Sequence, residues 1–205
     1  MSGRSRWGPE GPPEEAYSRV TNAKRFRPLH GAMLEIIGRL ESDFDVARED
    51  GYGLDEGLEG HFNRALPGVR LTPNDPGAAP IAVVFSSFPG LYVRFGRWYR
   101  EPFPGCGCDA CDESAEGNIK RLTRIIDNVT TGRFREGIRL PLMPLMGSGW
   151  RETEFWTPAG RSSISGDRVD RQSARRLSGG RRRLNLDWKP WPSRHDAGLG
   201  SAPAC

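Results

Sequence analysis

The 205-residue sequence lacks features that mark several common classes of protein. It has no stretch of about 18 apolar residues, which argues against a membrane-spanning helix. Its first residues carry no apolar signal core, so we expect a protein that is not exported. Structural disulfides are rare in the reducing cell interior. We therefore expect a cytoplasmic protein with no membrane partner, whose four cysteines do not serve as structural disulfides.

Motifs for catalysis and for nucleotide binding are also missing. The three histidines, His30, His61 and His195, each stand alone in the sequence. There is no G-x-S-x-G nucleophile turn, no H-E-x-x-H zinc motif and no phosphate-binding loop. We therefore assign no catalytic residue and favour a protein that acts through binding rather than catalysis.

The composition indicates one domain with tails. The chain has 26 glycines and 17 prolines, a share above the usual one, so we expect less regular structure than average. Residues 1–14 are small, charged and rich in proline and glycine, which predicts a disordered tail. We expect a single ordered domain over residues 15–194 and a second flexible tail over residues 195–205.

Two stretches have apolar residues at helical spacing. A helix is predicted over residues 28–44, where Pro28 suits the first turn, and a second over residues 112–131. Acidic residues open the second stretch, where they favour the helix dipole. Each stretch has one apolar stripe to bury. The stripes consist of Leu29, Met33, Ile36, Ile37, Leu40 and Phe44, and of Ile119, Leu122, Ile125, Ile126 and Val129.

Strands are predicted on either side of a Pro-Gly turn. Residues 81–86 are apolar and β-branched, and residues 91–98 alternate apolar with polar, which predicts an antiparallel hairpin. Together with the helices this gives an α+β fold, a small antiparallel sheet packed by two main helices. Weaker patterns predict a short helix through Leu58, Phe62 and Leu66, a strand over 150–156, a helix over 169–177, and a strand through Leu184 and Leu186.

The sharpest motif is a C-x-C-x-x-C cluster, Cys106, Cys108 and Cys111, at the start of the second predicted helix. Gly105 and Gly107 permit a tight backbone, so the three sulfurs can approach one point. A helix N-terminus favours thiolates, which are the ligands that zinc prefers. The motif therefore predicts a candidate zinc site, with partly buried loop residues and redox chemistry as the alternatives.

Tetrahedral zinc needs a fourth ligand. The sequence has no second C-x-x-C and no H-x-x-x-H pair to supply it. The candidates are His30, His61 and His195, a carboxylate such as Asp109, or a water molecule. A water in that position would leave the alternative of a zinc-dependent enzyme open.

Basic residues concentrate in the last quarter of the chain, where residues 151–194 contain 11 Lys and Arg against 5 Asp and Glu. Arginines at helical spacing can line a phosphate backbone, which makes a nucleic-acid-associated protein an alternative. We favour a solvated face that is ion-paired with Asp167, Asp170 and other carboxylates, because a recognisable nucleic-acid module is missing. The arginines are Arg168, Arg171, Arg175, Arg176, Arg181, Arg182 and Arg183.

The segment before the C-terminal tail carries two tryptophans. Trp188 and Trp191 flank a Lys-Pro pair, and residues before proline avoid the helix, so the segment should be extended. We interpret it as a strap whose indoles cover the core. The alternative is a surface that binds a partner.

Four stretches of the sequence together resemble a known family. They are residues 17–22, 88–91, 106–113 and 186–191. The family is an uncharacterised bacterial one, a domain of unknown function, and the likeness spans roughly residues 15–194. The resemblance implies a bacterial cytoplasmic setting and implies no activity, ligand or fold.

Overall fold

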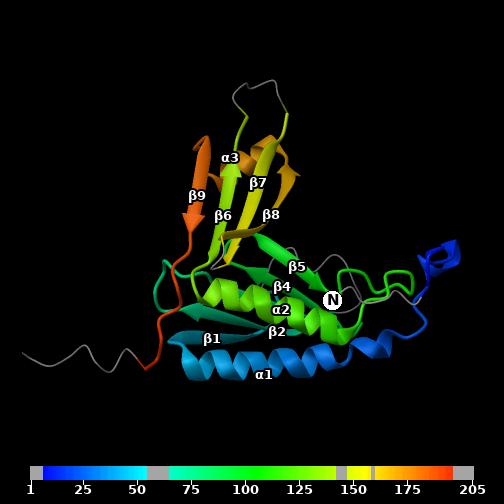
Figure 1. Ribbon diagram of the computed structural model, residues 1–205. Coiled ribbons are helices and arrows are strands. Elements are labelled where there is room, and N and C mark those ends of the chain that lie inside the picture. The colour runs from blue at the N-terminus through cyan, green and yellow to red at the C-terminus, as the bar shows by residue number, and fades with distance from the viewer. Residues whose placement is uncertain (1–6, 55–64, 142–146, 158–159, 196–205) are drawn as a thin grey trace, which may run out of the picture.

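The computed structural model describes residues 7–54, 65–141, 147–157 and 160–195. Within these ranges nine strands form two antiparallel sheets, accompanied by three α-helices (Figure 1). The fold is therefore α+β, as the sequence predicts. The predicted single small sheet is wrong, because there are two sheets. In the part of the chain that the structure describes, no helix is long and apolar enough to cross a membrane.

The first sheet is a meander of five strands in the order β1-β2-β3-β4-β5. Its central hairpin is the predicted one: β3 and β4 pair around the Pro-Gly turn, with Val83 opposite Val93. The strands are β1 (Val46–Gly51), β2 (Ala65–Pro73), β3 (Ile81–Ser86), β4 (Leu91–Phe95) and β5 (Tyr99–Phe103).

Two helices lie side by side along one face of the first sheet (Figure 1). They are α1 (Pro28–Asp43) and α2 (Ala115–Thr130), close to the predicted ranges. The predicted stripes form the main core with strands of the first sheet. Helix α2 begins three residues later than predicted because Ser114 caps it, its Oγ accepting the Gly117 N–H at 3.1 Å.

The second sheet has four strands in the order β8-β7-β6-β9 and rises from the first sheet, with α3 near its far end (Figure 1). Its elements are β6 (Phe134–Arg139), β7 (Gly149–Thr157), β8 (Gly160–Val169), α3 (Arg171–Leu177) and β9 (Arg183–Asp187). Helix α3 packs on β7 at Gly149, where an added Cβ would come within 2.4 Å of the Ala174 Cβ. The sequence signal for this sheet is weak at β9, where the alternation of Leu184 and Leu186 with polar residues covers only five positions.

A buried carboxylate joins the two sheets. Glu136 on β6 is fully buried and accepts four N–H hydrogen bonds. Three come from the backbone at the turn before β5, from Arg97 at 2.7 Å, Trp98 at 2.9 Å and Tyr99 at 2.7 Å. The fourth comes from the indole of Trp188 at 3.0 Å. One side chain thus fixes the second sheet to both the first sheet and the C-terminal segment.

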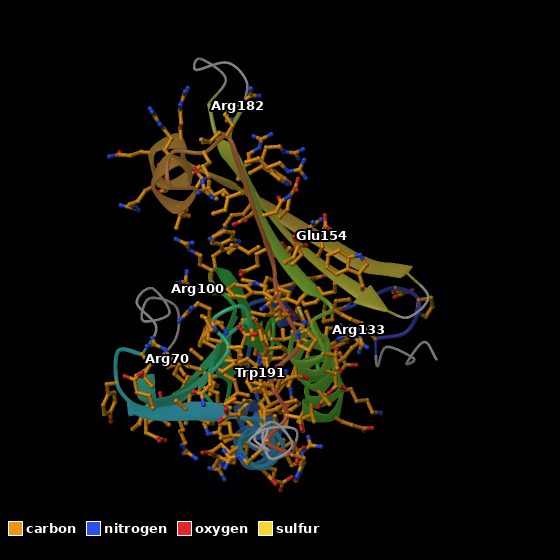
Figure 2. All side chains as sticks on the ribbon, turned by 90° about the vertical axis from the view of Figure 1, so that its left-hand side faces the viewer. Arg70, Arg100, Arg133, Glu154, Arg182 and Trp191 are labelled. Atoms are coloured by element: carbon orange, nitrogen blue, oxygen red, sulfur yellow. The ribbon has the colours of Figure 1, made fainter. Side chains whose placement is uncertain are left out.

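The C-terminal segment is a strap across the core, as predicted. Trp191 is buried, donates its indole N–H to the Ala79 carbonyl at 2.8 Å and meets Phe44 edge-on. Figure 2 shows Trp191 in the densely packed part of the molecule, among core side chains. Lys189, between the two tryptophans of the strap, donates to Asp75 at 3.2 Å from Nζ to Oδ2.

Two predictions about the weaker patterns are corrected. Leu66 lies in β2, not in a helix, while Leu58 and Phe62 lie outside the described residues. Val169 ends β8, and α3 begins only at Arg171, after the Asp170 cap. Of the predicted tails, residues 1–6 and 196–205 lie outside the described residues, and Trp7 packs partly buried against the cysteine loop.

Candidate metal centre in the cysteine loop

The three predicted cysteines come together in the loop between β5 and α2. Cys106 Sγ lies 3.1 Å from Cys108 Sγ, and Cys108 Sγ lies 3.4 Å from Cys111 Sγ. All three sulfurs lie within 4.8 Å of one another, and none is in a disulfide. The three thiols therefore form a cluster that can hold one metal ion.

Glu113 closes this loop just before α2. Its carboxylate accepts the backbone N–H of Cys106 at 2.6 Å and that of Gly105 at 3.1 Å. Asn118, one turn into α2, donates to the same carboxylate at 3.0 Å. The first half of the cysteine motif is thus tied to the helix that follows it.

Arg25 ties the loop to the N-terminal segment. Its guanidinium donates to the carbonyls of Gly107 at 3.0 Å and Cys108 at 3.1 Å, and to that of Glu113 at 3.3 Å. Figure 1 shows the N-terminal segment beside this loop, at the end of the molecule away from β9. Sequence reasoning missed both Arg25 and Glu113, since neither belongs to a recognisable ligand pattern.

The proposed fourth ligands have other contacts or lie elsewhere. Both Asp109 carboxylate oxygens accept the Thr21 N–H at 3.2 Å, and one lies 3.6 Å from Arg25. His30 Nε2 lies 3.0 Å from the Gly90 carbonyl, and the ring meets Phe85 edge-on. His61 lies outside the described residues, and His195 is exposed near the end of the strap. Among the described residues the metal-ligating group consists of the three cysteines.

The thiols perturb one another. The hydrogen bond from Cys106 lowers the pKa of Cys108, whereas the hydrogen bonds of Cys106 and Cys108 raise the pKa of Cys111 to about 12. Three neighbouring thiolates repel one another in the absence of a counter-charge. A bound cation removes this conflict, because a metal deprotonates the thiols that it coordinates.

A cavity of about 260 Å³ opens beside the cysteine loop. Its wall is mostly apolar and includes two of the three cysteines. The principal lining side chains are Tyr17, Phe88, Leu91, Tyr92, Cys106 and Cys108. The backbone of Gly107 approaches the Phe88 ring closely here, and an added Cβ would come within 2.6 Å of it, so the ring would have to move. The candidate metal centre therefore borders a space large enough for a small molecule.

Residues 4–195 match the family described as "Family of unknown function (DUF6226)". The chain belongs to this family. The match spans all four stretches on which the resemblance rested, and the family description assigns no activity. Comparison of the DUF6226 chain with curated proteins and with solved structures gave no match.

The arginine run of the DUF6226 domain is divided among several elements. The prediction that Arg168 shares a helix face with Arg171 and Arg175 is wrong, because Arg168 lies in β8. Arg171, Arg175 and Arg176 belong to α3, and Arg181–Arg183 lead into β9. The helical spacing fails because Val169 and Asp170 end the strand and cap the helix.

The two carboxylates expected to pair with this run accept hydrogen bonds from other groups. Asp167 accepts from Arg151 at 2.9 Å, and Asp170 caps α3 by accepting the Ser173 N–H at 2.9 Å. Within the part of the chain that the structure describes, no ion pair is formed by Arg168, Arg175, Arg176, Arg181, Arg182 or Arg183. These arginines are exposed, which agrees with the predicted solvated face, whereas the predicted ion pairs are not formed among the described residues.

Proposed function

We propose that this DUF6226 domain binds zinc through Cys106, Cys108 and Cys111 and acts through binding, as a bacterial cytoplasmic protein. The observation that carries the proposal is the approach of three sulfurs to within 4.8 Å of one another. Zinc–sulfur bonds are about 2.3 Å long, so two thiolates on a tetrahedral zinc lie about 3.8 Å apart. The sulfur separations of 3.1 and 3.4 Å need to open by less than about 1 Å to reach this spacing.

The surroundings support a structural role for the ion. Cys108 and Ala110 pack against Ala16, and the Ala110 N–H donates to the Ala16 carbonyl at 3.1 Å. Zinc would hold Cys111 to this packed unit and so fasten the N-terminal segment to the start of α2. Structural zinc contributes directly to folding free energy.

A zinc-dependent enzyme is the second candidate, and the cavity beside the loop favours it. Three protein ligands leave one position of a tetrahedral ion for water or substrate. Cys106 and Cys108 line the cavity, so an open position could face it. A fourth ligand from His61 would instead close the site.

Metal analysis of purified protein tests the main proposal. We expect about one zinc per chain in the parent protein and in Cys205→Ser, which keeps the cluster. We expect none in the triple Cys106→Ser, Cys108→Ser, Cys111→Ser variant. Equal zinc in the parent and in the triple variant, or no zinc in the parent after growth and purification with added zinc, would overturn the proposal.

Cobalt substitution separates the structural site from the open one. Co²⁺ bound by three thiolates absorbs through its sulfur ligands, and the spectrum reports the coordination number. A spectrum unchanged by added imidazole or 2-mercaptoethanol indicates a closed site. A spectrum that shifts with either ligand in the parent, and in His61→Ala alike, indicates an exchangeable fourth position and favours the enzyme.

A further inference from the structure

A row of basic and aromatic side chains crosses the second sheet near its far end. Arg139 on β6 stands directly opposite both Arg183 on β9 and Trp150 on β7. Trp150 in turn stands opposite Arg168 on β8. Directly paired residues of antiparallel strands point to the same face, so one face presents Arg183, Arg139, Trp150 and Arg168 in sequence across all four strands. The row spans three strand spacings, about 14 Å.

This face is the one that the core does not use. The alternate residues of the same strands, among them Ile138, Phe155 and Leu184, turn towards the buried side, where Ala174 of α3 also packs. Trp150 is 37% exposed. Its indole lies over Gly166, where an added Cβ would come within 2.6 Å of the indole nitrogen. One side of the ring therefore rests on the sheet, and the other is available to a flat ligand.

A groove runs beside the tryptophan. It has a volume of about 550 Å³, and three arginines and the indole share its wall with Leu140 and Pro141. The arginines are Arg139, Arg182 and Arg183. The Leu140 N–H donates to the Arg182 carbonyl at 2.8 Å, which holds Arg182 at the groove. Figure 2 shows Arg182 at the end of the second sheet that lies farthest from Trp191.

The charge of this face is unevenly distributed. Arg139 pairs with Glu152, which stands in the next row. Arg168, Arg182 and Arg183 form no ion pair with the described residues, so three positive charges remain around the indole. Further down the same face, Arg135 pairs with Asp187 and Glu154. The uncompensated charge is thus concentrated at the Trp150 row.

We propose that this face, the Trp150 row with Arg182, binds a single strand of nucleic acid. A base stacks on Trp150 while the arginines contact the flanking phosphates. Single-strand binders combine a positively charged groove with exposed aromatic side chains in this way. Stacking needs an unpaired base, because the bases of a duplex are already stacked on their neighbours. The inference does not depend on the proposed zinc site, which belongs to the loop after the first sheet.

Fluorescence anisotropy with labelled U12 RNA and T12 DNA tests the proposal on the full-length protein. We expect binding to both strands that weakens with salt, with a slope of log affinity against log salt of about −0.7 per phosphate contact. The variant Arg168→Ser, Arg183→Ser should flatten this slope by about 1.4. The matched control Arg175→Ser, Arg176→Ser removes the same charge from α3, on the other side of the sheet, and should keep the parent slope.

Stacking is tested separately at Trp150. Trp150→Ala should weaken binding by between about 5-fold and 150-fold, and Trp150→Phe should fall between that variant and the parent. Each variant is compared only after its melting temperature matches that of the parent, and the phenylalanine variant provides the reading if the alanine variant unfolds. Binding of RNA but not DNA, or of DNA but not RNA, supports the proposal and identifies the strand.

Three results would overturn it. The first is no binding of either oligonucleotide at 50 mM salt and micromolar protein. The second is an equal loss of affinity in the Arg168/Arg183 variant and in the Arg175/Arg176 control, which would indicate only non-specific attraction of polyanions. The third is tighter binding of a duplex, of heparin or of anionic vesicles than of single strands, with no effect of Trp150→Ala.

Discussion

The Glu113 carboxylate accepts the backbone N–H of Cys106 at 2.6 Å and so fixes the first residue of the cysteine motif. Replacing Glu113 by Gln puts an amide in place of one carboxylate oxygen and leaves a backbone N–H of the loop facing it. Groups that orient metal ligands typically contribute a factor of 10–100 to affinity. We expect Glu113→Gln to weaken zinc binding by about that factor, measured by competition with a chromophoric chelator.

A matched control lies three residues further along the chain. Glu116 is exposed in the first turn of α2, where it pairs with Lys120. Glu116→Gln makes the same chemical change at the same helix end, and we expect it to leave zinc affinity unchanged. Equal losses in the two variants would mean that helix charge, not the support of Cys106, controls the site.

The sequence predicted the cysteine cluster but not its supports. Glycines on either side of Cys106 and the short spacing to Cys111 suffice to indicate that the thiols can converge. Arg25 contributes through a contact with Cys108 that spans 83 residues of sequence, and no local pattern reports such a contact. The approach of the three thiols can therefore be predicted from the sequence, whereas the long-range hydrogen bonds that fix the loop cannot.

Packing of the two long helices gives a prediction for stability. Ile37 and Ile126 are buried in the main core, at the centre of their apolar stripes. Truncation of either to Ala should lower the free energy of unfolding by about 2–5 kcal/mol, through lost burial and the cavity left behind. Leu34 on α1 is 53% exposed, so Leu34→Ala should change it by about 0.5 kcal/mol or less. Urea unfolding curves that coincide for Ile37→Ala and Leu34→Ala would contradict this assignment of the core.

The two helices and the second sheet differ in how far the sequence predicts them. Helices α1 and α2 were predictable because each buries a full apolar stripe. The second sheet was only partly predictable, because β9 alternates Leu184 and Leu186 with polar residues over a mere five positions. The spacing of Arg168 and Arg171 indicated one helix, whereas Arg168 lies in β8. The contact between the two sheets runs through Glu136, whose partners lie 37 to 52 residues away, and no local pattern reports such a contact.

The Asp75 carboxylate predicts a dependence of stability on acid pH. The Gly77 N–H, at 2.7 Å, and secondarily Lys189 hold the pKa of Asp75 below its usual value. The carboxylate therefore stabilises the fold above its unfolded pKa of about 3.9, and this contribution is lost as pH falls towards the folded value. Asp75→Asn does not titrate, so its deficit relative to the parent should shrink from pH 6 to pH 3, measured by urea unfolding.

Lys189→Met provides the control for this pH dependence. It removes the weaker of the two causes and leaves the Gly77 hydrogen bond to Asp75 in place. We expect this variant to keep most of the loss of stability between pH 5 and pH 3 that the parent shows. A loss as small as that of Asp75→Asn would mean that the ion pair with Lys189, and not the backbone N–H, lowers the Asp75 pKa.

Glu136 provides the sharpest test of how the two sheets are joined. Each of its carboxylate oxygens accepts two N–H groups. Glu136→Gln replaces one of these oxygens by an NH2 group, which cannot accept, so two N–H donors lose their acceptor. A buried donor left without a partner costs about 1–3 kcal/mol, and two such donors lower the free energy of unfolding by at least about 2 kcal/mol. Glu152→Gln, in a partly exposed pair with Arg139 on the same sheet, should cost no more than about 1 kcal/mol. Urea unfolding curves report the difference, and equal destabilisation by the two substitutions would show that the buried carboxylate does not hold the sheets together.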